Sequence, residues 1–201
     1  MIVVGLTGGI ASGKSYVIKY LTKLKIPTHE SDNIVNSFYQ KPNKNFLELL
    51  YKEGFDQAIK KNKIDKKIIR DEIFINQHKR IKLEKFLHKE VKKKRNEFIK
   101  KHKITQKHNL IFLDIPLLFE NNLETGCDYV CSTIAPVKTR EKRALQRTGM
   151  SRNIFKRIVK SQVKDKFRRL KSNFIINTTK TKAYTCTQVD NMLYNILKKE
   201  K

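Results

Sequence analysis

Residues 2–16, IVVGLTGGIASGKSY, decide the fold. The stretch begins with an apolar run, Ile2 to Leu6, and ends in the pattern Gly8-x-x-x-x-Gly13-Lys14-Ser15. An apolar strand, a glycine-rich loop and a helix in this order are typical of a phosphate-binding loop. A glycine-rich turn can also do no more than join a strand to a helix, but the complete pattern directly after an apolar strand favours the phosphate-binding loop.

Each position of this pattern has a chemical reason. Glycine lets backbone N–H groups approach an anion that side chains would obstruct, and Lys14 adds a positive charge near the β- and γ-phosphates of a nucleotide. The hydroxyl of Ser15 can hold Mg²⁺, and the helix that starts near Lys14 points its positive end at the same phosphates. We expect the Lys14 side chain to face solvent. The predicted nucleotide-binding residues of the loop are Gly8, Gly9, Ala11, Ser12, Gly13, Lys14, Ser15 and Tyr16.

The composition predicts a folded domain with a strong positive charge. The 201 residues suffice for one α/β domain with an embedded subdomain, and 39% of them are hydrophobic. The 45 basic and 19 acidic residues give a formal net charge of +26, which suits an anionic partner. A biased composition explains this charge equally well, because the lysines are scattered over the whole chain.

The number of cysteines and the hydropathy of the chain indicate the cellular compartment of the protein. Cys127, Cys131 and Cys186 are an odd number without the spacing of a disulfide framework, which fits a reducing compartment. No apolar run approaches the length of a membrane span, and the chain begins in a strand rather than in a leader peptide. We therefore expect a soluble, cytoplasmic protein.

The segments after the loop predict an α/β domain with a helical insertion. A helix is expected over 14–25 and a strand over 26–29, which ends just before Asp32. Residues 34–107 show apolar residues at helical spacing and no strand pattern, and within them Asp65 is a predicted helix cap. Further on we predict strands over 110–115, 128–135 and 174–176, and basic helices over 137–147 and 151–171 with Ser151 as a cap. The last helix is predicted to bury Val189, Met192, Leu193, Ile196 and Leu197.

Asp32 is the first candidate for chemistry on a phosphate. It follows the second strand, which we place beside the first, so its carboxylate could approach the phosphates. There it could accept a proton from an attacking hydroxyl or orient Mg²⁺. The alternative is a structural role as the cap of a helix that starts at Asn33.

A row of arginines is the second candidate. Arg140, Arg143 and Arg147 are spaced by three and four residues and would share one helical face. They could close over the transferring phosphate as a lid, or they could form a solvated basic face. Asp114 is the only candidate for a carboxylate at the end of a central strand.

Together these motifs resemble the dephospho-coenzyme A kinase family, from Met1 to about Asn177. GLTGGIASGKS is similar to the opening motif of that family, and DIPLLFE, residues 114–120, is similar to a second and very distinctive motif. The other similarities are Asp32 in ESD, LHKEVKK over 87–93, Arg143 with Arg147, Arg157-Ile158 with Gln162, and FIIN over 174–177.

The resemblance implies a fold and a set of site residues. The fold is the α/β P-loop kinase fold, a five-stranded parallel sheet flanked by helices, as a single domain over 1–201. It carries a helical acceptor-binding insertion at 34–107 and an arginine-rich lid at 138–165. Mg²⁺ would be held by Ser15, with Asp32 as a second candidate. The implied catalytic residues are Asp32, Lys14 and Arg147, further ATP contacts are Arg143 and Asn177, and the acceptor-binding residues are Asp32, His88, Lys92 and Leu117.

The implied activity is ATP-dependent phosphorylation of the ribose 3′-hydroxyl of dephospho-coenzyme A, the last step of coenzyme A synthesis. The resemblance also implies a small-molecule partner, no nucleic-acid or membrane partner, and a monomer. One alternative is another small-molecule P-loop kinase, which DIPLLFE argues against. The other is a nucleic-acid-binding ATPase or a basic binding module, which would need exposed aromatic residues among the basic ones. Phe86, Phe98 and Tyr39 fit helix-core positions instead.

The chain departs from the family pattern at four places. Lys89 stands where proline is usual, Arg140 replaces a common glutamine, Thr148 replaces an aspartate, and Ser172-Asn173 replaces Ala-Asp. These changes affect substrate binding and the contacts that the lid makes when it closes.

Overall fold

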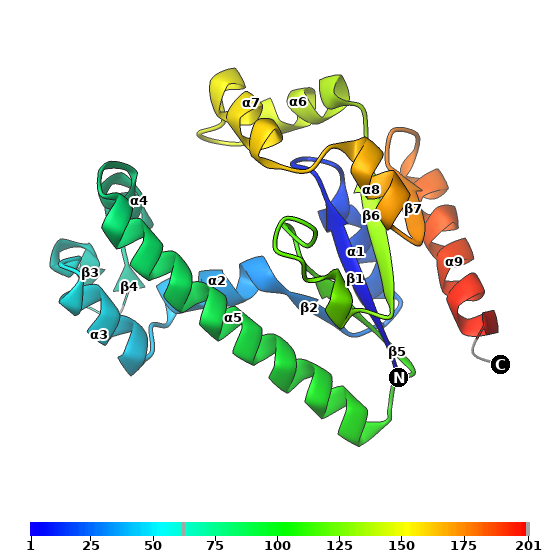
Figure 1. The fold of residues 1–201 in the computed structure, drawn as a ribbon, viewed down its shortest axis with the longest axis horizontal. Helices are drawn as coiled ribbons and strands as arrows, with labels where there is room; N and C mark the ends of the chain where they lie inside the picture. The colour runs from blue at the N-terminus through cyan, green and yellow to red at the C-terminus, as the bar shows by residue number, and fades with distance from the viewer. Residues whose placement is uncertain (62, 200–201) are drawn as a thin grey trace. The chain divides into compact units, whose positions relative to one another are not determined.

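The computed structural model describes residues 1–61 and 63–199. The chain divides into two compact units, one formed by residues 1–29 with 102–201 and the other by residues 30–101. The last two residues of the predicted domain lie outside the described residues. Figure 1 gives the order of the elements along the chain.

The first unit is built on a five-stranded parallel sheet, which confirms the predicted fold class. The expectation that the second strand lies beside the first is wrong, because the fully buried third strand takes that place and leaves the short second strand at the edge. A continuous apolar strand is most stable in the middle of a parallel sheet, because both of its faces are covered there. The strands, in spatial order, are β2 (Thr28–Glu30), β5 (Leu110–Asp114), β1 (Ile2–Gly8), β6 (Tyr129–Ile134) and β7 (Phe174–Asn177).

The register of the sheet decides which side chains reach the loop that follows β1. Leu6 of β1 lies opposite Asp114 of β5, and Gly8 lies opposite Thr133 of β6. Because the strands are parallel, Asp114 and Thr133 both come to the carboxyl edge of the sheet. Ligands of open α/β sheets gather at that edge.

Two helices cover one face of the sheet and form the main core. They are α1 (Lys14–Lys23) and α9 (Lys182–Lys199), and their apolar residues pack with those of the strands. Leu193 of α9 packs against this core, but the predicted burial of Leu197 is wrong, because Leu197 is 44% exposed. Helix α1 ends two residues before the predicted end, and Lys25 then has a φ of 59°. The core residues are Ile2, Val4, Leu6, Val17, Ile18, Leu21, Leu110, Phe112, Cys131, Ile176, Val189, Met192 and Ile196.

Three further α-helices belong to the described part of this unit, namely α6 (Val137–Leu145), α7 (Arg152–Ser161) and α8 (Asp165–Lys171), together with the short 3-10 helix η2 (Glu124–Gly126). Figure 1 shows α6 and α7 beyond the carboxyl ends of β1 and β6. The single basic helix predicted over 151–171 is wrong, because the chain leaves the helix between α7 and α8. At this break Gln162 accepts from the backbone of Ile10, and the N–H of Val163 donates to Glu120.

The second unit is mainly helical and has its own core. Three phenyl rings, of Phe38, Phe46 and Phe86, pack together with centroids 5.6–6.0 Å apart. The prediction that residues 34–107 contain no strand is wrong, because a hairpin of two-residue strands lies between the helices. Strands this short cannot show the period of two that predicts a strand. The elements are α2 (Ser31–Gln40), α3 (Lys44–Lys52), η1 (Asp56–Ala58), β3 (Ile59–Lys60), β4 (Lys63–Ile64), α4 (Lys66–Ile75) and α5 (Gln77–Thr105).

Hydropathy of the helices bears on membrane association. Within the described parts of the chain, no helix combines the length and the apolar character needed to cross a membrane.

Candidate nucleotide-binding site

The loop between β1 and α1 is closely packed against its surroundings. A Cβ on Gly8 would collide with the side chains of Thr133 and Ser12 and would lie 2.8 Å from the carbonyl oxygen of Thr133. Gly13 has a φ of 91°, which side chains rarely tolerate, and Ala11 has a φ of 56°. Glycine is therefore required at both ends of the loop, by packing at Gly8 and by backbone conformation at Gly13.

Hydroxyl groups hold the buried side of the loop to the sheet. The Oγ atoms of Ser12 and Thr133 are 2.7 Å apart, and Thr133 donates to the carbonyl of Thr7 at 3.2 Å. Thr178, in the segment after β7, donates to the carbonyl of Ser12 at 2.6 Å. These bonds satisfy buried polar groups and fix the loop in one shape.

Helix α6 contacts the same region through Arg143. Its Nη1 donates to Thr178 Oγ1 at 3.0 Å and its Nη2 donates to the carbonyl of Thr178 at 2.6 Å. Asn177, predicted to contact ATP, uses its Oδ1 to accept from the N–H of Thr179 at 2.9 Å. The structure thus brings Arg143 and Asn177 to the segment that braces the helix end of the loop.

Arg140 has a different environment from the one predicted. It is only 4% exposed, so the expectation of an exposed lid arginine is wrong for this residue. Its Nε donates to the carbonyl of Ala135 at 3.1 Å, and its Nη2 lies 3.4 Å from Asp165. Burial lowers the pKa of Arg140, and the carboxylate of Asp165 opposes that change.

Arg147 does not share a helical face with the other two arginines. Helix α6 ends at Leu145, and Arg147 lies exposed in the turn that follows. The predicted single face is therefore wrong, because the helix stops before the third arginine. Arg147 remains accessible to a ligand.

Lys14 and Asp114 form an ion pair at the carboxyl edge of the sheet. Their side chains are 14% and 5% exposed, so the expectation of a solvent-facing Lys14 is wrong. The neighbouring Ser15 is exposed. The hydroxyl of Tyr16 lies 3.4 Å from Cys186 Sγ, and this contact raises the pKa of Tyr16.

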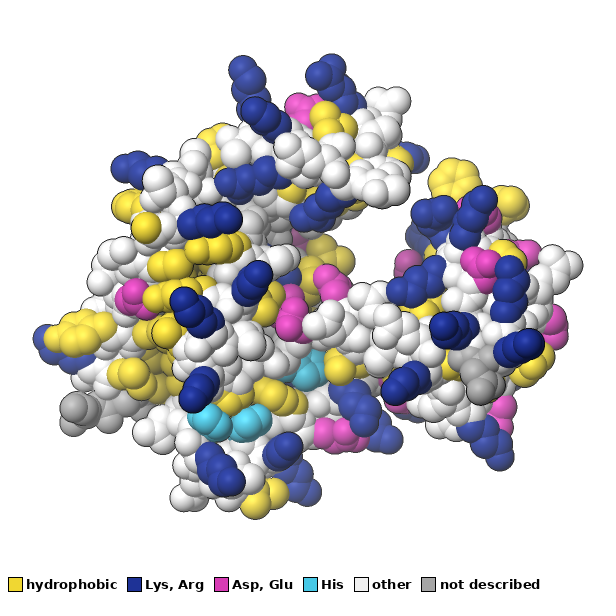
Figure 2. Space-filling model, turned by 180° about the vertical axis from the view of Figure 1, so that it is seen from behind, with side chains coloured by type: hydrophobic (Ala, Val, Ile, Leu, Met, Phe, Trp, Pro, Cys, Tyr) yellow, Lys and Arg dark blue, Asp and Glu magenta, His cyan; other side chains and the backbone are white. Residues whose placement is uncertain are grey.

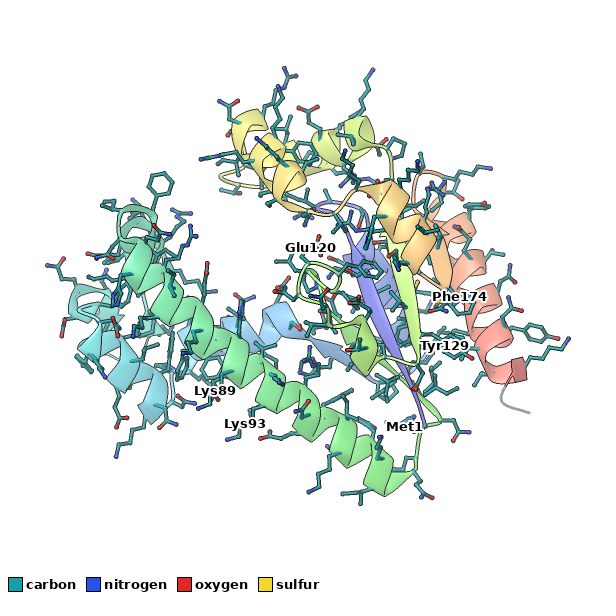
Figure 3. The ribbon with its side chains drawn as sticks, in the orientation of Figure 1. Met1, Lys89, Lys93, Glu120, Tyr129 and Phe174 are labelled. Atoms are coloured by element: carbon teal, nitrogen blue, oxygen red, sulfur yellow. The ribbon has the colours of Figure 1, made fainter. Side chains whose placement is uncertain are left out.

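Leu117, predicted to contact the acceptor, lies in the turn after β5 and is 41% exposed. Glu120 lies further along the same turn (Figure 3). Glu120 accepts from Arg168 of α8 at 3.2 Å. The distinctive DIPLLFE segment therefore provides one exposed apolar side chain, Leu117, and one partly buried carboxylate, Glu120, that binds Arg168.

Asp32 belongs to the second unit and is exposed in the first turn of α2. The helix begins at Ser31, its cap is Glu30, and the side chain of Glu30 makes no capping hydrogen bond. A cap role for Asp32 in a helix starting at Asn33 is therefore contradicted. What remains as a structural role is the weak attraction of a carboxylate to a helix N-terminus.

His88 and Lys92 are exposed on helix α5 of the second unit. A hollow of about 530 Å³ runs along this helix, and Figure 3 shows Lys89 and Lys93 projecting from the same side of it. This side can attract an anion. The residues that line the hollow are Lys89, Lys92, Lys93, Asn96, Glu97 and Lys100.

Sequence reasoning missed several residues that shape the loop. Thr133 and Thr178 are brought to it only by the pairing of strands far apart in the sequence, and no local pattern indicates them. Gln162 was part of a family similarity but had no role assigned. In the structure the side chain of Gln162 supports the loop, because its Oε1 accepts a hydrogen bond from the N–H of Ile10 at 2.9 Å.

Comparisons with known proteins agree with this geometry. The solved structure of a shikimate kinase from Acinetobacter baumannii covers 99% of this chain and 94% of its own, with a TM-score of 0.54 and 14% identity. At that identity the likeness concerns the fold alone. Together with the Gly8–Ser15 loop, this likeness gives the chain the P-loop kinase fold.

Proteins of higher sequence identity identify the family within this class. A dephospho-CoA kinase from Bartonella henselae is 34% identical over 200 residues, covering 98% of this chain and 100% of that protein. The solved structure of the dephospho-CoA kinase from Campylobacter jejuni has a TM-score of 0.70 and 25% identity, covering 99% and 98% of the two chains. The dephospho-CoA kinase family model matches residues 2–183. The chain belongs to the dephospho-CoA kinase family.

Proposed function

We propose that this chain transfers the γ-phosphoryl group of ATP to the ribose 3′-hydroxyl of dephospho-coenzyme A, which completes coenzyme A synthesis. The observation that supports this proposal best is the braced Gly8–Ser15 loop, with Lys14 at its helix end, in a member of this family. The proposed enzyme works as a monomer in the cytoplasm.

The residues present fit a triphosphate with Mg²⁺. Gly8 and Gly9 let the loop pack closely against Thr133 and Arg140, where a Cβ would collide, and the N-terminus of α1 directs its N–H groups at the loop. Lys14 would exchange its contact with Asp114 for one with the β- and γ-phosphates. Ser15 would hold Mg²⁺, which neutralises the charge on those phosphates when it is bound.

The transfer step needs one proton acceptor and a compensation of charge. The 3′-oxygen of the acceptor forms a bond to the γ-phosphorus as the bond from that phosphorus to the β–γ bridging oxygen breaks. Asp32 takes the proton of the attacking hydroxyl, which requires the exposed carboxylate seen in the first turn of α2. Arg147, also exposed, balances charge on the transferring group.

The second unit is the proposed acceptor-binding part, which covers the predicted insertion at 34–107. His88 and Lys92 would hold the anionic pyrophosphate of the acceptor. The lysines around the hollow on α5 support this, because they concentrate positive charge along one side of the helix.

Detection of ADP with different acceptors tests the proposal. Dephospho-coenzyme A should release ADP much faster than adenosine, AMP or pantetheine phosphate, and an analogue without the 3′-hydroxyl should release none. The product should gain one phosphate on the ribose. ADP release that does not depend on the acceptor would indicate an ATPase and overturn the proposal.

A nucleic-acid-binding role has less support. Figure 2 shows Lys and Arg side chains spread over the visible face rather than gathered in one patch. Tyr39 and Phe86 pack against the core of the second unit, so they do not offer an exposed stacking surface. A salt series with random-sequence DNA checks this, because nonspecific binding weakens steeply with salt and does not respond to ATP.

A further inference from the structure

Helix α6 carries two arginines that reach opposite ends of the phosphate-binding loop. Arg143 is bound to Thr178, which contacts the loop at Ser12 and Gly13, where α1 begins. Arg140 lies at the other end. A Cβ on Gly9 would collide with its Nη1.

The guanidinium of Arg140 is held in one orientation. Its Nε is fixed by the carbonyl of Ala135 and its Nη2 by Asp165. Asp165 is held in turn by Arg168, whose Nη1 lies 3.1 Å from its Oδ1, and Arg168 is bound to Glu120. This chain of contacts ties Arg140 to α8 and to the turn after β5, so the side chain cannot swing as a mobile lid residue would.

The third nitrogen of the Arg140 guanidinium, Nη1, remains available as a donor. Within the described residues, Nη1 makes no hydrogen bond to the protein, and this atom stays in contact with solvent although most of the side chain is buried. A guanidinium stays protonated at physiological pH, so this N–H group can donate to an anion. Its position beside Gly9 places this donor at the phosphate-binding loop.

We propose that Arg140 is a preset contact for the terminal phosphoryl group of the nucleotide. The helix end of the loop, with the N–H groups of α1, holds the α- and β-phosphates. Gly9 lies at the strand end, so a donor there faces the phosphate farthest from the nucleoside. This deepens the proposed function and rests on it for the identity of the nucleotide. Asp165 acts as a positioning residue, because its carboxylate pairs with Arg140 and with Arg168.

Binding of two nucleotides separates this role from a general structural one. Affinities for Mg·ATP and Mg·ADP are measured by calorimetry for the natural protein and for Arg140→Gln. Loss of one charge-assisted hydrogen bond should weaken ATP binding about tenfold or more, while ADP binding stays within about twofold. Arg169→Gln is the matched control, because Arg169 is exposed on α8, and it should change neither affinity.

Equal loss of affinity for ATP and ADP, or no loss for either, would overturn the proposal. If Arg140→Gln does not fold, Arg140→Lys makes the same test. A lysine that keeps Asp165 as its partner has no second nitrogen for the phosphate, so ATP affinity should again fall selectively. The binding experiment needs no acceptor. Failure of the natural protein to phosphorylate dephospho-coenzyme A would therefore overturn the proposed function without deciding the role of Arg140.

Discussion

The ammonium group of Lys14, the first residue of α1, is paired with the carboxylate of Asp114, the last residue of β5. The register that sets Asp114 opposite Leu6 brings this carboxylate to the edge where the loop begins. Lys14 is thereby held close to the loop. The same pair also makes Lys14 part of the folded structure rather than a free charge.

Lys14→Ala should therefore have two effects. Turnover should fall by about a hundredfold or more, because a single positive contact to a transferring phosphoryl group contributes about 3 kcal/mol to catalysis. The melting temperature should also fall, since Asp114 is 5% exposed and loses its cation. Loss of one partner of a buried pair costs about 3 kcal/mol. Steady-state kinetics and thermal unfolding measure the two effects.

The double variant Lys14→Ala with Asp114→Asn separates them. Removing the second charge should bring the melting temperature back toward that of the natural protein. Turnover should stay low, because the phosphate contact is still missing. Recovery of both would contradict the catalytic role of Lys14.

Thr178→Val tests the brace of the loop. The hydroxyl of Thr178 donates to Ser12 and accepts from Arg143, and the residue is 6% exposed. Its loss should destabilise the protein by about 1–3 kcal/mol, because buried partners lose a hydrogen bond, and should raise the Michaelis constant for ATP. Thr179→Val is the matched control, since Thr179 is exposed. An unchanged Michaelis constant would exclude Thr178 from shaping the nucleotide site.

Local patterns predicted the parts of the fold that depend on neighbouring residues. The strand, loop and helix around Gly8–Ser15 are of this kind, because sterics and the spacing of glycines act within a few residues. Two helix caps are also confirmed. Asp65 accepts from the N–H groups of Lys67 and Ile68, and Ser151 accepts from that of Ile154.

Features set by contacts between distant residues could not be predicted this way. The position of β2 beside β5 depends on which strand buries more apolar surface, and the break at Gln162 depends on the N–H of Ile10. Burial of Arg140 depends on Asp165, which no periodicity connects to it. Spacing alone placed the arginines on one face and could not show that α6 ends at Leu145.

His88→Ala with Lys92→Ala tests the proposed acceptor site on α5. The apparent Michaelis constant for dephospho-coenzyme A should rise, because cations facing the pyrophosphate are lost, and that for ATP should change little. Lys101→Ala is the control, since Lys101 is exposed on the same helix and does not line the hollow. Equal weakening for both substrates would argue against an acceptor role.

Asp32→Asn tests the proposed proton acceptor. A capping role is already contradicted, because Glu30 is the cap of α2 and Asp32 lies within its first turn. The structural cost of the substitution should thus be small, on the order of 0.3–1 kcal/mol from the helix dipole. If Asp32 accepts the proton or orients Mg²⁺, the same change removes the negative charge that the reaction uses. Phosphoryl transfer should then fall by about 10²–10⁴-fold.

Three measurements on this variant distinguish chemistry from structure: transfer to dephospho-coenzyme A, ATP affinity and the melting curve. ATP binding should survive, because the donors of the Gly8–Ser15 loop are unchanged. Asp56→Asn supplies the control, since Asp56 is an exposed acid in the first turn of η1 in the same unit, and it should leave transfer intact. Normal transfer in Asp32→Asn would refute the catalytic role. Lost transfer with retained ATP affinity and an unchanged melting curve is the result expected of a kinase carboxylate.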